Sequence, residues 1–190
     1  TPAGPHKPKM ANASKRLAKE IRDLDPPEGC TAAPTETDIY AWNCMVAGPR
    51  DTPYEGGKFE LTLKFPPEYP LRPPKASFKT RVYHPNVKDD GEICIDILKD
   101  AWSATLSVGK ILLSIQLLLS DGNAASPLMP DIAEVYAKDR PAFNRTAREW
   151  SIKYAGAPAD AAAGDAAAAA AAAPAAPAAA AAGGGASSSS

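Results

Sequence analysis

Apolar and polar residues alternate strictly through residues 58–65. The odd-numbered positions there are aromatic or aliphatic, and the even-numbered positions carry lysine, glutamate or threonine. A period of two predicts a strand with one face in the core and the other in water. Residues 39–46 are rich in large apolar and β-branched side chains and predict a neighbouring strand. Gly48-Pro49 and Gly56-Gly57 supply turns, so an antiparallel arrangement is the simplest one.

Helical spacing of apolar residues marks the N-terminal part of the domain. Leu17, Ile21 and Leu24 recur at intervals that place them on one face of a helix. Asn12 or Ser14 can cap the start of this helix, and two prolines at 26 and 27 end it.

Three further helices are predicted in the second half of the chain. Ser107 can cap a mostly apolar helix that runs to about Leu119 and packs against the sheet. Two more helices are expected near residues 131–138 and 140–154, and Asp139 is a suitable cap for the second of them.

Prolines at positions 66, 67, 70, 73 and 74 exclude regular structure between the strands and Lys75. The aromatic residue before Pro70 favours a cis Tyr69-Pro70 bond. A short strand is expected at 75–80, and residues 81–106 show little periodicity. With a first strand starting at Cys30, the order of elements predicts an α+β fold. Its sheet is a four-stranded antiparallel meander, accompanied by an N-terminal helix, a central crossover helix and two C-terminal helices.

The composition changes at both ends of the chain. Residues 1–11 contain several prolines and a glycine and are expected to be a flexible extension. Residues 12–155 have the size of one ordinary domain. Residues 156–190 are almost entirely Ala, Pro, Gly and Ser, which predicts a low-complexity tail without a stable fold.

Charge and cysteine content narrow the classes of function. A formal net charge of −1 gives no electrostatic argument for nucleic-acid binding. No apolar run approaches the roughly 20 residues that a membrane helix needs, and no signal-peptide segment is seen. The odd count of 3 cysteines fits free thiols, so a reducing cytoplasmic or nuclear compartment is expected. Without a CxxC motif or a histidine pair, no metal site is expected.

The segment around Cys94 carries the candidate chemistry. A thiol can hold an acyl group, the side-chain amide of Asn86 can stabilise an oxyanion, and the carboxylate of Asp96 can steer an amine. Cys30 and Cys44 lie in predicted strands, where core packing is the simpler interpretation. The acidic flanks of Cys94 should not lower the pKa of its thiol, and His84 is poorly placed as a base. These residues indicate acyl transfer and disfavour a cysteine hydrolase.

Several motifs occur together in a specific order, and through them the chain resembles a ubiquitin-conjugating enzyme of the short, broad-specificity class. The resemblance covers roughly residues 12–155. The motifs are Tyr69-Pro-Leu-Arg-Pro-Pro-Lys75, His84-Pro-Asn86, Gly91-Glu-Ile-Cys-Ile-Asp96, Trp102-Ser103, Lys110-Ile-Leu-Leu-Ser-Ile115 and Pro127-Leu128.

The resemblance implies a thioester transferase. Cys94 would accept ubiquitin from the ubiquitin-activating enzyme and pass it, with a RING or HECT ligase, to a substrate lysine or a ligase cysteine. Asn86 would stabilise the oxyanion, although a loop brace is an alternative role for it. His84 and Pro85 would hold the loop, and Asp96 would orient the donor or the lysine unless it is simply a solvated carboxylate. ATP would be used upstream, with no cofactor bound by the chain itself, which is expected to be a monomer.

The chain also departs from the family pattern. Many relatives have an acidic residue where this chain has Ser126, which predicts slower discharge to lysine unless phosphorylation restores the charge. Thr31 matches a position where some relatives bind a second ubiquitin, although ordinary surface is the simpler interpretation. The ligase surface of relatives maps onto one set of positions, and the changes within it are expected to alter ligase choice. That set is Arg16, Lys19, Leu71, Arg72, Ser103 and Ala104.

One alternative of the same fold is a noncatalytic scaffold that holds ubiquitin or a ligase. Scaffold variants lack the nucleophile, so the presence of Cys94 together with Asn86 argues against this alternative.

Overall fold

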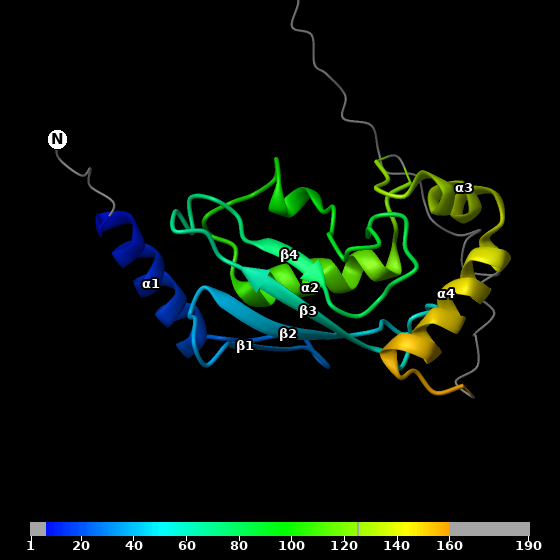
Figure 1. The fold of residues 1–190 in the computed structure, drawn as a ribbon, viewed down its shortest axis with the longest axis horizontal. Coiled ribbons are helices and arrows are strands. Elements are labelled where there is room, and N and C mark those ends of the chain that lie inside the picture. The colour runs from blue at the N-terminus through cyan, green and yellow to red at the C-terminus, as the bar shows by residue number, and fades with distance from the viewer. Residues whose placement is uncertain (1–6, 125, 160–190) are drawn as a thin grey trace, which may run out of the picture.

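The computed structural model describes residues 7–124 and 126–159 and has four α-helices and a four-stranded sheet (Figure 1). In chain order the elements are α1 (Lys7–Arg22), β1 (Thr31–Pro34), β2 (Ala41–Ala47), β3 (Lys58–Lys64), β4 (Lys75–Phe78), the 3₁₀ turn η1 (Asp96–Leu98), α2 (Val108–Ser120), α3 (Pro130–Lys138) and α4 (Arg140–Ala155).

The sheet has the order β1-β2-β3-β4, and every neighbouring pair is antiparallel. The register places Cys44 opposite Leu61 and Leu63 opposite Ala76. The predicted α+β fold and its antiparallel meander are confirmed. The expected second strand began two residues early, at 39, and the fourth was two residues too long at its end.

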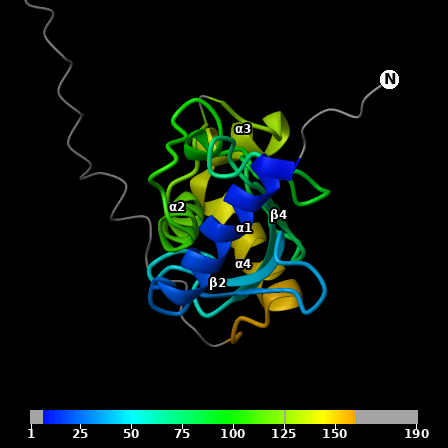
Figure 2. The same cartoon turned by 90° about the vertical axis from the view of Figure 1, so that its left-hand side faces the viewer.

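One face of the sheet forms the core, as the alternation in β3 predicts. Phe59, Leu61 and Leu63 are almost completely buried, and the intervening Lys58 and Glu60 are exposed. Helix α2 lies along this face and buries most of its apolar residues there (Figure 2). The Ser107 side chain accepts a hydrogen bond from the Lys110 N–H, so the predicted cap is confirmed.

The remaining helices lie at the two ends of the sheet. Helix α1 stands at one end, and α3 and α4 stand at the other (Figure 1). The Asp139 carboxylate caps α4 by accepting from the Ala142 N–H at 3.0 Å, as predicted. The Tyr69-Pro70 bond is cis, as expected. Within the described residues, no helix has both the length and the apolar character needed to cross a membrane.

Helix α1 begins earlier than the sequence pattern predicted. Helix α1 begins at Lys7 rather than at Asn12, so residues 7–11 of the expected flexible extension are helical. Pro8 stands in the first turn, where a missing N–H costs nothing because that group has no partner within the helix. Ser14 therefore lies inside the helix, and its hydroxyl forms a hydrogen bond with the Tyr40 hydroxyl instead of a cap. Residues 1–6 lie outside the described residues.

Residues that directly follow α4 contact the rest of the folded chain. Gly156 ends α4 in the left-handed conformation, and Ala157 is buried. The Arg148 guanidinium donates to the backbone carbonyls of both Glu55 and Pro158 and so joins this segment to the turn after β2. Composition assigned these residues to the tail, and the structure shows that Ala157 is buried and that the Pro158 carbonyl is bound by Arg148. Residues 160–190 of the predicted tail lie outside the described part of the chain.

Candidate functional site

The segment that carries Cys94 is held against the sheet edge by backbone contacts. Ser77 and Glu92 form an isolated antiparallel bridge, and the Cys94 N–H donates to the Asn86 carbonyl at 3.0 Å. Gly91 makes this course possible. It has a φ of 86°, and a Cβ atom at this position would lie 2.0 Å from the Phe78 carbonyl oxygen. Both the conformation and the space exclude a side chain.

His84 lies inside the loop, with both ring nitrogens in hydrogen bonds. Its Nδ1 accepts from the Asn86 N–H at 3.0 Å, so Nε2 carries the proton and donates to the Leu118 carbonyl at 2.9 Å. Burial lowers the pKa of His84 to about 4, which keeps the ring neutral. The imidazole therefore ties the loop to α2 and is not in contact with the thiol as a base.

The neighbouring Pro85 links the same loop to the segment before α3. Its carbonyl oxygen accepts hydrogen bonds from the Leu128 N–H at 2.8 Å and the Met129 N–H at 3.0 Å. The loop is thus attached on two sides, to α2 through His84 and to residues 128–129 through Pro85.

The Asn86 side chain is buried and joins two loops. Its Oδ1 accepts from the Asn123 N–H at 2.7 Å, and its Nδ2 donates to the carbonyls of Asn123 at 2.9 Å and Ser126 at 3.2 Å. Both N–H groups of the amide are therefore engaged. The structure shows the brace, and donation to an oxyanion would require one of these two bonds to open.

Four residues singled out from the sequence line one groove: Cys94, Asn86, Asp96 and Ser126. Cys94 is partly exposed there, whereas Cys30 and Cys44 are buried in the core. Burial raises the pKa of both core thiols, that of Cys44 to about 12. Of the three cysteines, Cys94 alone combines access with a groove.

The Cys94 sulfur contacts a lysine, whereas the acidic residues beside it in the sequence predicted an acidic environment. Lys99 donates from Nζ to Cys94 Sγ at 3.0 Å. This hydrogen bond raises the pKa of Lys99. Sequence reasoning missed Lys99, since its position follows from η1, which returns the chain towards the thiol. The only local signal was its separation of five residues from Cys94.

Carboxylates line the groove at positions that the sequence analysis did not consider. Asp100 and Asp121 join Asp96 along its wall. Asp96 begins η1, and its Oδ1 accepts from the Ile97 N–H at 2.8 Å. Ser126 is exposed at the same groove and carries no charge. The lining of the groove therefore contains the carboxylates of Asp96, Asp100 and Asp121 together with Lys99, even though the position before Pro127 is a serine.

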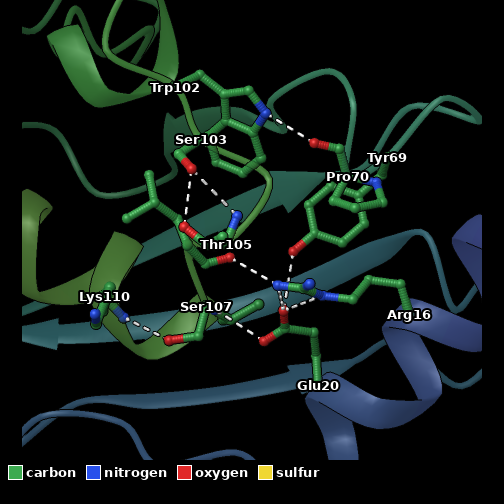
Figure 3. A network of polar contacts seen from close by, with 11 residues as sticks. Arg16, Glu20, Tyr69, Pro70, Trp102, Ser103, Thr105, Ser107 and Lys110 are labelled. Atoms are coloured by element: carbon green, nitrogen blue, oxygen red, sulfur yellow. Dashed lines mark hydrogen bonds and ion pairs between the residues drawn. The ribbon is translucent and has the colours of Figure 1, made fainter.

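A second cluster connects α1 with the two loops expected to bind ligases (Figure 3). The buried Glu20 carboxylate accepts from the Arg16 side chain at 2.7 Å, from the Tyr69 hydroxyl at 3.2 Å and from the Val108 N–H at 3.1 Å. A carboxylate at the N-terminal end of α2 also interacts favourably with the helix dipole. The sequence analysis missed Glu20 because these contacts come from distant parts of the chain.

Arg16 was expected to be available to ligases, and in the structure its partly exposed guanidinium already has partners within the domain. Its guanidinium also donates to the Leu106 carbonyl at 3.0 Å and lies over the Tyr69 ring, so it is largely committed within the domain. The Trp102 indole donates to the Pro70 carbonyl at 2.9 Å and holds the two loops together.

The other positions of this surface are accessible to different degrees. Leu71 is 78% exposed; Lys19, Arg72 and Ser103 are exposed; and Ala104 is partly buried. Thr31 is exposed on the edge strand β1 and does not line the groove. The structure therefore separates the predicted residues into the groove, the loop surface and the sheet edge.

No three His, Cys, Asp or Glu side chains come together as a metal-binding group in residues 7–124 and 126–159.

Comparison with known proteins gives two consistent results. Residues 16–151 match the family model of ubiquitin-conjugating enzymes. Among solved structures, the E2 domain of a Toxoplasma gondii ubiquitin conjugating enzyme is 40% identical and superposes with a TM-score of 0.70. That match covers 75% of this chain and 98% of the other chain.

Proposed function

The chain belongs to the ubiquitin-conjugating enzyme family, and on that premise we propose that Cys94 is the residue that carries ubiquitin. The family transfers ubiquitin through a thioester and works with an activating enzyme and a ligase. The observation that supports Cys94 is its partial exposure in a groove, while Cys30 and Cys44 are buried. Burial also raises the pKa of those two thiols and disfavours their reactive thiolates.

In the loading step, the Cys94 sulfur attacks the thioester that joins ubiquitin to the activating enzyme. A new carbon–sulfur bond forms as the old one breaks, the sulfur of the activating enzyme leaves with the electron pair, and the proton lost by the Cys94 thiol ends on that sulfur. ATP is consumed before this step, so the chain itself needs no cofactor. Neutral His84 makes its hydrogen bonds to backbone groups of the loop and α2. An imidazole used in this way is not available to activate water, which favours survival of the thioester until an amine arrives.

In the transfer step, a lysine amine attacks the thioester carbonyl carbon. A carbon–nitrogen bond forms, the carbon–sulfur bond breaks, and the proton lost by nitrogen ends on the Cys94 sulfur. The carboxylates of Asp96, Asp100 and Asp121 line the groove and attract the incoming ammonium group. Asn86 donates to the oxyanion once one of its Nδ2 bonds to the carbonyls of Asn123 and Ser126 opens. The Asn86 amide thus has two hydrogen-bonding arrangements, one that braces the loops and one that donates to the oxyanion.

Ser126 affects the rate of the same step. It supplies no charge at the groove, so discharge to free lysine is slower than with a carboxylate there. Phosphorylation of its exposed hydroxyl would add negative charge and speed this discharge.

The ligase is bound at the surface formed by the first helix and the two loops. Exposed Leu71, Arg72 and Ser103 contact the ligase directly, Lys19 adds a positive charge, and Ala104 lies beside Ser103. Arg16 holds the loops in place by donating hydrogen bonds to the Glu20 carboxylate and the Leu106 carbonyl. We place both RING and HECT ligases here, with transfer to a lysine in the first case and to a ligase cysteine in the second. Thr31 is assigned no contact beyond ordinary surface.

The enzyme is further proposed to act as a monomer in the cytoplasm or nucleus, where free thiols persist.

A gel assay tests the assignment. The full chain is incubated with ubiquitin-activating enzyme, ATP and ubiquitin, and a thiol-sensitive adduct is expected that disappears in Cys94→Ala and persists in Cys30→Ala. Failure of every ubiquitin-like donor to load would favour the scaffold alternative. Loading that persists in Cys94→Ala would refute the assignment of the nucleophile.

A further inference from the structure

The Cys94 sulfur accepts a hydrogen bond from a cationic group of the same chain. Lys99 donates from Nζ to Cys94 Sγ at 3.0 Å, and both residues line the same groove. The backbone builds this contact. Directly before Lys99 the chain makes the 3₁₀ turn η1, and the Lys99 N–H closes that turn by donating to the Asp96 carbonyl at 2.8 Å. The turn returns the lysine to the thiol five residues earlier.

Negative charge develops on this sulfur in both steps of the proposed reaction. In loading, Cys94 attacks through its thiolate, which is the nucleophilic form of cysteine. In transfer, the carbon–sulfur bond breaks and its electron pair stays on the sulfur. A donor that already lies in contact with Sγ needs no rearrangement to stabilise that charge, and hydrogen bonds to ionised groups are stronger than those between neutral groups. The hydrogen bond to Cys94 also raises the pKa of Lys99, which favours its charged form.

We propose that Lys99 is a catalytic residue whose ammonium group stabilises the negative charge on Cys94 Sγ in both steps. The inference rests on the proposed function of Cys94. In loading, Lys99 donates to the attacking sulfur while its bond to the ubiquitin carbonyl carbon forms and the bond to the activating enzyme's sulfur breaks. In transfer, the carbon–nitrogen bond forms and the carbon–sulfur bond breaks. Lys99 donates to the departing sulfur until the proton lost by the attacking amine arrives there. Lys99 keeps its own proton throughout and acts by its charge.

The exposure of Lys99 sets the size of the expected effect. Its side chain is in contact with water, and exposed charges contribute little individually and are screened by salt. Removal of the charge should therefore slow each step by about two- to fivefold. The difference between the parent chain and the variant should become smaller as the salt concentration rises.

Lys88 supplies a matched control from the same segment. It is partly exposed, it forms an ion pair with Glu92, and it does not line the groove of Cys94. Lys88→Gln and Lys99→Gln each remove one positive charge near Cys94, but only the second removes the donor that touches the sulfur. Lys99→Arg keeps the charge and the ability to donate.

The first readout needs no ubiquitin. The full chain is treated with excess iodoacetamide at neutral pH, and alkylation of the peptide that contains Cys94 is followed by mass spectrometry. Lys99→Gln should be alkylated about two- to fivefold more slowly than the parent chain. Lys99→Arg and Lys88→Gln should react at close to the parent rate, and added salt should narrow the difference for Lys99→Gln.

The second readout follows transfer in a single turnover. The full chain is loaded with ubiquitin, ATP is depleted, and loss of the thiol-sensitive adduct is measured after hydroxylamine is added at neutral pH. Hydroxylamine is largely uncharged under these conditions, so the charges of the groove have little influence on its arrival. Discharge should be about two- to fivefold slower in Lys99→Gln than in the parent chain, Lys99→Arg or Lys88→Gln.

Three results would overturn the inference. Lys99→Gln is alkylated and discharged at the parent rate, Lys99→Arg is as slow as Lys99→Gln, or Lys88→Gln is slowed as much as Lys99→Gln. The last result would assign the effect to the net charge of the segment and not to the contact with sulfur. Each of these leaves the proposed function intact, because the thioester is seen. If no thioester forms at all, the proposed function fails, and the catalytic role of Lys99 falls with it even where the alkylation rates differ.

Discussion

Replacing Asn86 with alanine separates its two roles. The change removes the hydrogen bonds that its amide makes to the Asn123 N–H and to the carbonyls of Asn123 and Ser126. At about 1 kcal/mol for each bond, the free energy of unfolding should fall by up to about 3 kcal/mol. For a chain of this size that corresponds to a decrease in Tm of about 6–12 °C.

The catalytic role predicts a separate effect on rate. Loss of an oxyanion donor typically slows the chemical step by about 10²–10³-fold. The assay preloads Cys94 with ubiquitin, adds free lysine well below the Tm of the variant, and follows loss of the thiol-sensitive adduct. Lysine discharge should fall by about two orders of magnitude in Asn86→Ala.

A variant destabilised elsewhere controls for stability. Leu61 is fully buried in β3, and Leu61→Ala should cost about 2–5 kcal/mol. This variant should discharge to lysine at nearly the parent rate while it remains folded. If Asn86→Ala discharges as fast as Leu61→Ala, Asn86 is a brace only. If Asn86→Ala unfolds at the same urea concentration as the parent, the brace is refuted.

Three further changes test other parts of the site. The pKa of His84 is lowered from 6.5 to about 4, so the unfolded state binds the proton first as pH falls below 6.5. Urea unfolding should therefore show that this group lowers the free energy of unfolding by about 2 kcal/mol between pH 7 and pH 5. An equal loss in His84→Gln would contradict this assignment. Gly91→Ala should lower the free energy of unfolding by at least about 1–3 kcal/mol, because of its φ of 86° and the nearby Phe78 carbonyl, and an unchanged urea midpoint would rule out that strain. Ser126→Asp should speed discharge of the loaded enzyme to free lysine about two- to fivefold, as expected for an exposed charge pair, and an unchanged or slower rate would remove Ser126 from the account.

The elements of the fold were predictable where local pattern determines them. The alternation through β3 identified the buried face, and Ser107 and Asp139 marked the starts of α2 and α4 because a cap depends on residues only a few positions away. The start of α1 at Lys7 was missed because the prolines and the glycine of residues 1–11 predicted a flexible extension, whereas a proline in the first turn of a helix is tolerated.

The parts that were missed depend on contacts between distant residues. Arg148 draws Pro158 onto the domain, and the composition of that segment contains no sign of this contact. Glu20 was not singled out and Arg16 was assigned to the ligase surface, yet together they connect α1 to Tyr69, Leu106 and Val108.

In the candidate site too, some residues were predictable from local sequence and others were not. Asn86, Cys94, Asp96 and Ser126 were expected to act together, and they line one groove. Lys99 was overlooked, because a lysine in an acidic loop is usually a solvated charge and its contact with sulfur depends on the turn η1.

The position of the acyl group tests the central claim most directly. The full chain is loaded with ubiquitin under native conditions, quenched without thiol, and digested for peptide mass spectrometry. The account predicts a thiol-labile modification on the peptide that contains Cys94, its absence in Cys94→Ala and its persistence in Cys30→Ala. A thiol-labile adduct on Cys30 or Cys44, or undiminished loading in Cys94→Ala, would contradict the account.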